Sequence, residues 1–448
     1  ARTANRGSIS TGYDIDNSIK FEADNSEQLY RTPSSDGNMK TWTYSVWFKR
    51  TELGVSSQLI SALDTYMYFE TNDTAWLNLR SASTNFFMAT NRVFRDTSAW
   101  YHAVIACDTT DSTPADRLKL YINGVRETSF SNNTYENIDG NDDTGMNKAT
   151  VHRIGTYSNF GAYFNGYMAE INQIDGQALD PTEFGEFDDS GIWKPKAYTG
   201  TYGTNGFYLD FADASDLGDD ESGNGNDFTE GNITSADQAT DTPTNNFCTL
   251  NPLWVYGNAL TTGPIEGATK VSGGGWAGTK ATMGVANGKW YWEYKSSVSD
   301  AIIGIQTDEG VALTGNAHNI ISTCALYLAG EVWIKDSTSG RNDTDVTHTF
   351  SSSSIYGIAL NMDDNQISFY QDGSLITNGG NIALDGLADK TVFPFASNYN
   401  SAIEFNLGGY TTISISSAAA DANGYGTFEY APPSGYYALC TKNLAEYG

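Results

Sequence analysis

The chain has few cysteines and no long hydrophobic run. Its 448 residues include four cysteines, at positions 107, 248, 324 and 440, and no C-x-x-C pair. A disulfide framework or a zinc site is therefore not expected, and the apolar runs around Cys107 and Cys440 predict small buried side chains. No apolar run approaches the ~20 residues of a membrane-spanning helix. The N-terminal ARTANRGSIS lacks the apolar core of an intact signal peptide, so we expect no membrane insertion.

Positive charge is also scarce. Lysine and arginine total 25 against 54 aspartates and glutamates, which gives a net charge of −29 and a pI near 4.3. A field of this sign repels nucleic acid and anionic membrane surfaces, so neither is expected as a partner. Solubility, or adaptation to salty water, accounts for the excess of acid, and cation binding is the alternative.

The sequence lacks the common motifs of nucleophilic, metalloprotease and phosphate-binding sites. It contains no G-x-S-x-G and no H-E-x-x-H. Of its four histidines, His102 and His152 fall in strand-like runs and are expected to be structural. The glycine cluster at 273–275 precedes a tryptophan and no helix, so it does not predict a phosphate loop.

Alternating strands joined by short turns dominate what is present. In Tyr356–Tyr370, YGIALNMDDNQISFY, apolar residues alternate on both sides of an Asp-rich turn, and Gln371-Asp372-Gly373 predicts a second turn. A similar unit, RLKLYINGV at 117–125, stands in the first half. Abundant tyrosine, glycine, asparagine, serine and threonine with 18% charged residues is an all-β composition.

The length favours two domains. We expect two β-sandwich, jelly-roll-like domains in series, joined by an ordered segment rich in glycine, asparagine and aspartate. The expected divisions are an N-terminal arm at 1–17, a first sandwich at 18–190, the ordered linker at 191–255, a second sandwich at 256–410 and a C-terminal tail at 411–448 packed on the second domain.

Both halves resemble known β-sandwich families. The first resembles a laminin-G-like, concanavalin A-like lectin/glucanase domain, on WTYSVWFKR (42–50), WYHAVIACD (100–108), RLKLYINGV (117–125), IGTY (154–157) and FNGYMAEINQIDGQALDPTEF (164–184). The second resembles a SPRY domain, on GKWYWEYK (288–295), IIGIQ (302–306), YGIALNMDDNQISFYQDG (356–373), VFPFAS (392–397) and IEFNLGG (403–409). SPRY domains are non-catalytic recognition modules, so this resemblance implies binding rather than catalysis.

The joining and closing segments resemble proteins of tailed bacteriophages, marine ones in particular. The runs are GIWKPKAYTGTYGTNGFYLDF (191–211), SGNGNDF (222–228) and PPSGYYALCTKNL (432–444). The resemblance implies a non-enzymatic virion protein, made in the host cytoplasm, that serves as a tail fibre or receptor-binding appendage for attachment to host surface glycans. It further implies other virion proteins as partners and a homo-oligomer. A head fibre or capsid decoration protein, a glycan hydrolase and a bacterial surface adhesin are the alternatives.

The hydrolase alternative depends on a pair of carboxylates. The lectin/glucanase family places its catalytic acids on one strand as E-x-D-x-x-E, and retaining chemistry needs two carboxyls ~5 Å apart. The nearest stretch here, Glu170 to Asp175 (EINQID), lacks the central aspartate and the final glutamate. We therefore expect no catalytic residues and no enzyme activity.

Two acidic runs offer the oxygen ligands that calcium prefers. Neither run has the spacing of an EF-hand loop, so solvated turns are the main interpretation, no cofactor is expected, and calcium is the alternative. The candidate ligands are Asp139, Asp142, Asp143, Asp219 and Asp220.

Two further groups of residues are candidate contacts. Aromatic rings beside polar side chains suit glycans, and the loop of Tyr157, Asn159, Phe160 and Tyr163 is the best such stretch. In the arm, Arg2 and Arg6 are cations ahead of a very acidic body, which suggests an assembly contact with an acidic partner. A freely mobile terminus, and aromatics that only pack the loop onto its sheet, are the alternatives.

Overall fold

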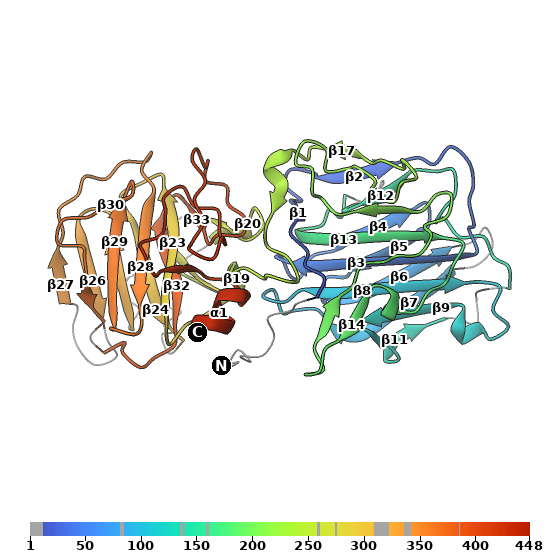
Figure 1. Ribbon diagram of the computed structural model, residues 1–448, viewed down its shortest axis with the longest axis horizontal. Coiled ribbons are helices and arrows are strands. Elements are labelled where there is room, and N and C mark those ends of the chain that lie inside the picture. Colours follow the sequence, from blue (N-terminus) through green and yellow to red (C-terminus); the bar gives the residue numbers. More distant parts are fainter. Residues whose placement is uncertain are drawn as a thin grey trace. The chain divides into compact units, whose positions relative to one another are not determined.

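The protein is built almost entirely of β-strands (Figure 1). The computed structural model describes residues 12–80, 85–134, 138, 140–157, 161–257, 260–273, 276–308, 322–335, 342–384 and 386–448. Within these ranges α1 (Thr441–Tyr447) is the one α-helix, and no helix has the length and hydrophobicity to span a membrane. The all-β prediction is confirmed. The chain divides into a first unit that ends at Thr244 and a second unit, Asn245–Gly448.

Two sheets form the first unit, and Figure 1 shows β3, β8 and β13 in one layer and β4, β5 and β6 in the other. The first of these layers, here called sheet A, contains in spatial order β10 (Val125–Arg126), β9 (Leu118–Ile122), β8 (Tyr101–Asp108), β3 (Thr41–Arg50), β13 (Gly166–Asp175), β1 (Ser18–Phe21) and β18 (Gln238–Ala239), with β16 (Phe207–Leu209) paired to β13. Sheet B contains β11 (Phe130–Asn133), β7 (Asn85–Val93), β6 (Thr74–Arg80), β5 (Thr65–Phe69), β4 (Ser57–Ala62), β12 (His152–Ile154), β2 (Gln28–Arg31) and β17 (Thr229–Gly231).

The core of the first unit lies between sheets A and B. Strand β3 shows how the sequence builds it: Tyr44, Val46 and Phe48 alternate into the core cluster, and Trp47 faces the other side of the sheet. That other side is covered too, by residues 176–205, which include η3 (Pro181–Glu183) and the hairpin of β14 (Gly185–Phe187) and β15 (Trp193–Pro195). Sheet A is therefore buried on both faces.

Residues 191–244 belong to the first unit, which differs from the predicted division into a sandwich at 18–190 and a linker at 191–255. Strands β16, β17 and β18 from this segment pair with β13, β2 and β1, and η4 (Ser235–Asp237) lies just before β18. Phe207 and Phe211 are buried in the core of this same unit. Short, turn-rich strands of this kind gain their pairing from distant partners, so local composition does not reveal them.

Buried ion pairs connect sequence-distant segments of the first unit. Lys49 on β3 lies 2.7 Å from a carboxylate oxygen of Asp241, and both side chains are 1% exposed or less. Lys20 contacts Asp237 at 2.8 Å, also out of contact with solvent. Segments at the start and the end of the unit are thus joined by charge as well as by strand pairing.

The second unit is a second pair of sheets. One contains β19 (Leu250–Gly257), β22 (Trp276–Ala281), β32 (Val392–Tyr399), β24 (Ala301–Thr307), β25 (Thr323–Tyr327), β26 (Glu331–Lys335) and β27 (Asn342–Asp345). The other contains β20 (Leu260–Ile265), β21 (Lys270–Gly273), β33 (Ala402–Asn406), β23 (Lys289–Ser296), β28 (Tyr356–Asn361), β29 (Gln366–Gln371) and β30 (Ser374–Leu375), with β31 (Ile382–Ala383) on β29 and β34 (Tyr437–Ala438) parallel to β23.

The predicted turns lie where the sequence places them. Strands β28 and β29 pair from Asn361 opposite Gln366, so the Asp-rich turn lies between them. Asp372 and Gly373 both have positive φ, at 49° and 74°, and so do Asn123 and Gly124, at 50° and 76°. Two consecutive positive-φ residues define the type I′ hairpin turn, which explains why both units use an Asn-Gly or Asp-Gly pair.

A buried carboxylate contributes to holding the C-terminal tail on the second unit. Glu293 on β23 is fully buried and accepts the backbone N–H groups of Glu429 and Tyr430 at 3.0 and 2.9 Å. It also accepts the Asn406 amide at 3.0 Å and the Tyr291 hydroxyl at 3.2 Å. Four donors from three segments therefore converge on a single side chain.

Candidate functional site

The solvent-side face of sheet B carries a row of aromatic side chains. On β5 the sequence TYMYF alternates: Met67 and Phe69 are fully buried in the core, and Tyr66 and Tyr68 lie half-buried on the other face. Trp76 on β6 and Phe87 on β7 are also half-buried, between neighbours that enter the core. The period of two in a strand places all four on one face.

Together with Tyr157 these rings form a row in which each ring contacts the next. We call this row the aromatic ladder, and its spatial order is Tyr157, Tyr66, Tyr68, Trp76 and Phe87. Ring centroids lie 5.0 Å apart for the first pair, then 5.7, 6.1 and 6.4 Å along the row. Tyr68 and Trp76 are directly opposite each other across β5 and β6. Tilted and edge-on contacts at these distances are favourable, so the ladder is a preformed aromatic surface.

Carboxylates lie beside the ladder and are held in place by it. Glu70 accepts the Tyr68 hydroxyl at 3.4 Å and the Ser56 hydroxyl at 3.2 Å, and Asp64 accepts the Tyr157 hydroxyl at 3.5 Å. Burial, followed by the charge of Glu70, raises the pKa of Tyr68, so its hydroxyl stays protonated. Flat rings flanked by carboxylate acceptors and hydroxyl donors match the chemistry of a sugar, which has apolar C–H faces and hydroxyl edges.

Of the predicted glycan-binding residues, the structure places Tyr157 in the ladder. Tyr163 is half-buried and follows Ala162, whose carbonyl accepts the backbone N–H of Gln58 at 3.1 Å. Asn159 and Phe160 lie outside the described residues. Sequence reasoning missed the four ladder residues on β5, β6 and β7; the signal available was polar aromatics alternating with core residues in TYMYF.

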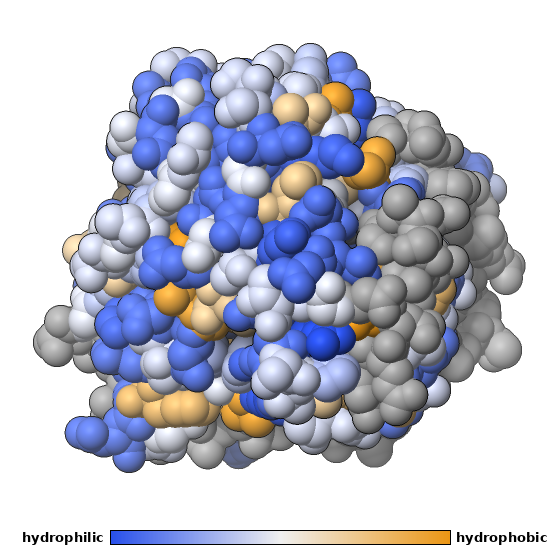
Figure 2. Space-filling view, turned by 90° about the vertical axis from the view of Figure 1, so that its right-hand side faces the viewer, coloured by the Kyte–Doolittle hydropathy of each residue, from blue (hydrophilic) through white to orange (hydrophobic). Residues whose placement is uncertain are grey.

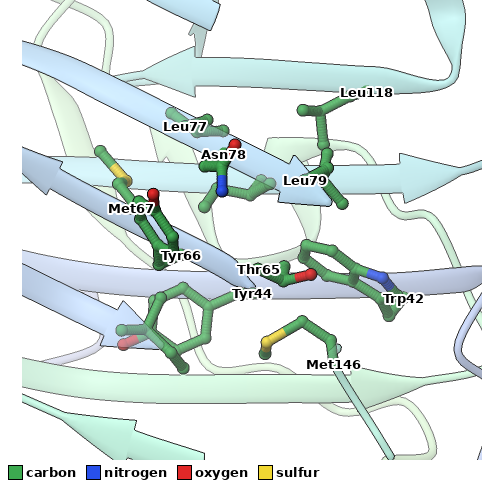
Figure 3. Close-up of a pocket in the computed structure, with 12 residues that line it drawn as sticks. Trp42, Tyr44, Thr65, Tyr66, Met67, Leu77, Asn78, Leu79, Leu118 and Met146 are labelled. Atoms are coloured by element: carbon green, nitrogen blue, oxygen red, sulfur yellow. The ribbon is translucent and has the colours of Figure 1, made fainter. Parts of the chain in front are cut away.

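One cavity inside the first unit is too small for a saccharide. A cavity of about 10 Å³ lies between the sheets, and Figure 3 shows Trp42 and Tyr44 from β3 facing Met67 and Leu79 from sheet B across it. One water molecule needs about that much room.

The face of the first unit that Figure 2 shows is mainly hydrophilic. Figure 2 shows hydrophobic residues there as small, separate patches rather than one continuous area. Exposed apolar side chains such as Val93, Val151 and Leu63 come from different strands and turns. Isolated residues of this kind are normal on a folded protein.

Asp220, one of the calcium candidates, is already saturated with hydrogen bonds. One oxygen accepts the backbone N–H groups of Tyr208 and Ser222, both at 2.9 Å. The other accepts the Asn226 N–H at 2.8 Å and the Ser222 hydroxyl at 2.9 Å. In this conformation the carboxylate organises its loop, and a cation would have to displace four donors.

The other calcium candidates are not gathered around a common point. Asp219 and Asp143 are exposed, and Asp142 is half-buried. Asp139 lies outside the described residues. Over the described part of the chain, no three histidines, cysteines, aspartates or glutamates are grouped so as to hold a metal ion.

A buried serine–histidine contact on sheet A has the wrong hydrogen-bond direction for nucleophilic catalysis. The Trp193 indole N–H can only donate, so His102 Nδ1 accepts it at 3.0 Å. Nε2 of the neutral ring then carries the hydrogen and donates to Ser45 Oγ at 2.8 Å. Burial lowers the pKa of His102 to about 3, so the ring stays neutral. A general base needs an unprotonated nitrogen facing the hydroxyl, and here an N–H faces it.

Asp175 and Glu170, the two acids of the stretch considered for glycan hydrolysis, are both buried and hydrogen-bonded. Asp175 is 8% exposed and accepts the backbone N–H groups of Asn38 and Asn205 at 2.7 and 2.9 Å. Glu170 is 7% exposed and lies under the hydroxyls of two tyrosines. Neither is open to a substrate in this conformation.

The described part of the predicted arm lies on the first unit. Ile15 is buried, its N–H donates to the Thr244 hydroxyl at 3.0 Å, and that hydroxyl donates to the Ile15 carbonyl at 2.9 Å. Arg2 and Arg6, the predicted assembly contacts, lie outside the described residues.

The second unit has its own aromatic cluster, on the outer face of the sheet whose edge strands are β19 and β27. Tyr327 stacks on Trp333 with centroids 4.7 Å apart, and Trp276 lies 5.7 Å from Tyr399. The Tyr327 hydroxyl donates to Asp300 at 2.6 Å. Aromatic side chains therefore gather on the outside of both sandwiches.

Comparison with known proteins supports the fold of the first unit. Residues 23–183 match the Concanavalin A-like lectin/glucanases superfamily, so the resemblance expected for this half is confirmed. A search of curated proteins found no match.

The chain is also similar to several solved structures. One is the SPRY domain of human HERC1, with 14% identity, a TM-score of 0.28, and coverage of 35% of this chain and 96% of that one. Another is a heptameric SAP-like pentraxin from Limulus polyphemus, with 18% identity, a TM-score of 0.28, and coverage of 38% of this chain and 80% of that one. A third is a putative carbohydrate binding protein from Bacteroides ovatus, with 15% identity, a TM-score of 0.29, and coverage of 42% of this chain and 63% of that one.

Proposed function

We propose that this protein binds glycans through the aromatic ladder on sheet B. The observation that carries the proposal is the contiguous row of five rings, from Tyr157 to Phe87, on the solvent side of a lectin-like sandwich. The carboxylates of Asp64 and Glu70 beside the rings supply acceptors for sugar hydroxyls. The match of residues 23–183 to a lectin and glucanase superfamily supports a carbohydrate ligand.

The biological setting that we propose is a tailed-phage virion. The protein would be a tail fibre or receptor-binding appendage, made in the host cytoplasm, that attaches the particle to host surface glycans. The resemblance of the segments at 191–211 and 432–444 to phage proteins supports this proposal. A homo-oligomer joined to other virion proteins suits such a role, because many weak sites add through multivalency. Head fibre or capsid decoration is the second candidate location.

We propose that the protein is not an enzyme. The neutral, inward-donating His102 and the engaged carboxylates of Glu170 and Asp175 support this proposal. Calcium stays an alternative only for residues other than Asp220, whose oxygens are occupied.

A binding experiment tests the ladder. Host polysaccharides and glycan arrays would be probed with the full chain and with Trp76→Ala and Tyr66→Ala. Loss of one stacking ring costs about 1–3 kcal/mol, so affinity should fall roughly tenfold or more. Phe187→Ala is the matched control, because Phe187 is 52% exposed but lies on β14, outside the ladder. Unchanged binding by both ladder variants, with folding intact, would refute the ladder as the site.

A second experiment tests the virion setting independently of the ladder. Antibodies against the purified chain should label phage particles at the tail, whereas labelling of the head would select the decoration alternative. Deletion of residues 1–12 should leave folding unchanged but prevent incorporation into particles. Particles that carry the truncated protein at normal occupancy would show that the anchor lies elsewhere.

A further inference from the structure

Three oxygen-bearing side chains form a closed ring at the start of the first unit. The Tyr13 hydroxyl lies 2.9 Å from Glu170 Oε2, the Tyr208 hydroxyl lies 2.8 Å from Glu170 Oε1, and the two hydroxyls lie 2.9 Å from each other. Tyr13 belongs to residues 12–17, which we call the N-terminal segment. Tyr208 is on β16 and Glu170 is on β13.

The backbone places Glu170 in this ring at some cost. Its φ is +51°, in the left-handed region that non-glycine residues rarely adopt, and the pairing of β13 with β3 shifts register between Ala169 and Asn172. The bulge turns the carboxyl towards the two tyrosines. Backbone strain of this kind persists only where the surroundings enforce it.

Counting hydrogens shows which form of Glu170 fits the ring. Three contacts of 2.8–2.9 Å each need one hydrogen between the oxygens. An ionised carboxylate leaves only the two phenolic hydrogens, so one pair of oxygens would face each other lone pair to lone pair. A carboxylic acid supplies the third: Glu170 donates to Tyr208, Tyr208 donates to Tyr13, and Tyr13 donates to the other oxygen of Glu170. Only the neutral acid satisfies every contact.

The surroundings favour the same form. The pKa of Glu170 is raised to about 7: burial is the largest cause, the hydrogen bonds of Tyr208 and Tyr13 lower it, and the charge of Asp210 raises it. Tyr202, which also interacts with the carboxyl, is neutral, and its hydroxyl donates to Asn172 at 3.0 Å. Burial raises the pKa of Tyr13, Tyr202 and Tyr208, so they keep their protons. No cation of the described chain is among the groups that influence Glu170.

We propose that Glu170 is a proton-operated latch that fastens the N-terminal segment to the first unit. The neutral acid closes a three-hydrogen ring with Tyr13 and Tyr208. Release of its proton to water removes one hydrogen from the ring, sets two oxygens in repulsion and loosens Tyr13, the member contributed by the N-terminal segment.

The direction of the pH dependence follows from linkage. A carboxyl whose pKa is higher in the latched state than in the released state stabilises the latch at low pH and loses that stabilisation as pH rises through the latched pKa. With a released pKa of 4.5 and a latched pKa of about 7, the latch is most secure in acid, weakens as pH rises between these two values, and changes little above them. Between about pH 5 and about pH 9 the opening equilibrium rises by up to roughly 80-fold, if opening hydrates the carboxyl fully.

Hydrogen exchange of the full chain tests the latch. The reporter is the Ile15 amide, which is bonded to Thr244 when the N-terminal segment is docked. After correction for the intrinsic pH dependence of exchange, protection of residues 12–17 should fall as pH rises from about 5 to about 7 and level off above that. Protection of β3 should not change.

Two variants keep the test decisive. Glu170→Gln replaces the acid with an amide that donates to Tyr208 and accepts from Tyr13 at any pH, so protection should become independent of pH. Tyr13→Phe removes one ring member, so protection of the N-terminal segment should be low throughout. Glu183→Gln, an exposed acid in η3, is the matched control and should behave like the wild type.

Infrared spectroscopy gives a readout that does not depend on docking. The difference spectrum between the wild type and Glu170→Gln should contain a carboxylic-acid carbonyl band below neutral pH, and this band should disappear above about pH 7. A difference spectrum without this band at low pH, or a Glu170→Gln variant whose N-terminal segment still loosens with rising pH, would overturn the proposal.

Discussion

The two sandwiches stabilise their buried charged side chains with different kinds of partner: the first uses opposite charges, and the second uses neutral groups. In the first unit, Lys20, Lys49 and Arg50 are each at most 1% exposed and each lies beside a buried carboxylate. In the described part of the second unit no ion pair has both partners buried. One of its buried acids, Glu293, is held by neutral donors, and the buried cation Lys280 is held by a carbonyl and an aromatic ring.

The difference follows from what each contact has to join. The first unit ties its start to its end, as when β3 meets the segment after β18 through Lys49 and Asp241. The second unit ties down a tail, and Glu293 does so by accepting backbone N–H groups whose positions are fixed by the chain. Ion pairs give specificity between distant segments, but removal of one partner leaves a charge without compensation.

Breaking an ion pair of the first unit should have the largest effect. Lys49→Met removes the ammonium partner of the buried Asp241 carboxylate, which also accepts the Trp100 indole N–H at 3.0 Å. A loss of about 3–5 kcal/mol is expected, because a buried charge without its partner is strongly destabilising. Calorimetry should show the first unit's transition fall while that of the second unit stays in place.

A surface pair supplies the control for this experiment. Lys40 lies 3.8 Å from Asp143, with side chains 37% and 55% exposed. Lys40→Met should change stability by no more than about 0.5 kcal/mol. Equal effects of Lys40→Met and Lys49→Met would contradict the role assigned to buried pairs in the first unit.

Weakening the anchor of the second unit should cost less. Glu293→Gln replaces one acceptor oxygen with an amide N–H₂, so two of the four donors lose their partner. The expected loss is about 1–3 kcal/mol. Hydrogen exchange should increase at Glu429 and Tyr430 before it increases in β28. Glu404→Gln, which loses a contact only with the Thr412 hydroxyl, is the control.

Removing the buried cation of the second unit should stabilise it slightly. Lys280 is 4% exposed, its Nζ lies 3.8 Å from the Trp254 ring centroid, and burial lowers its pKa to about 8. Its charged form is therefore disfavoured in the fold, and Lys280→Met should gain about 1 kcal/mol at neutral pH.

The pH dependence checks the cause of that gain. Because the folded pKa of about 8 is below the ordinary 10.5, the wild type becomes more stable as pH rises from 8 towards 10.5. The advantage of Lys280→Met should shrink over that range. Lys289→Met, in which the lost amine is 35% exposed, is the control for a general effect of removing a lysine.

The smallest expected effect is on glycan cleavage. Incubation of host glycans with the wild type and with Glu170→Gln should release no reducing ends from either, because the family's carboxylate set is incomplete and Glu170 lies under two tyrosines. Release by the wild type that Glu170→Gln abolishes would turn the comparison of two binding sandwiches into one between an enzyme and a binding module.

Much of the fold could be predicted from local pattern. Strands at Thr41–Arg50, Ala301–Thr307 and Tyr356–Asn361 follow from runs of alternating or continuous apolar residues, as expected from the sequence. The turns at Asn123-Gly124 and Asp372-Gly373 follow from residues that tolerate positive φ. These are short-range effects, so the sequence carries them directly.

The candidate site was only partly predictable. Tyr157 was identified from its loop, but the ladder needs β5, β6 and β7 to lie side by side in register, with Tyr68 opposite Trp76. Alternation within one strand does not specify which strand lies beside it or the register of the pairing. The same reason hid the role of residues 207–239 in both sheets of the first unit.

The sequence by itself determined the all-β class, the buried free cysteines, the acidic surface and the hairpin turns, since each depends on composition or on residues within a few positions of one another. Only the tertiary structure decided which aromatics share a face, which carboxylates accept which donors, and that Tyr13, Glu170 and Tyr208 meet in one ring. Those outcomes depend on strand register and, for the ring, on loop closure across the 157 residues that separate Tyr13 from Glu170.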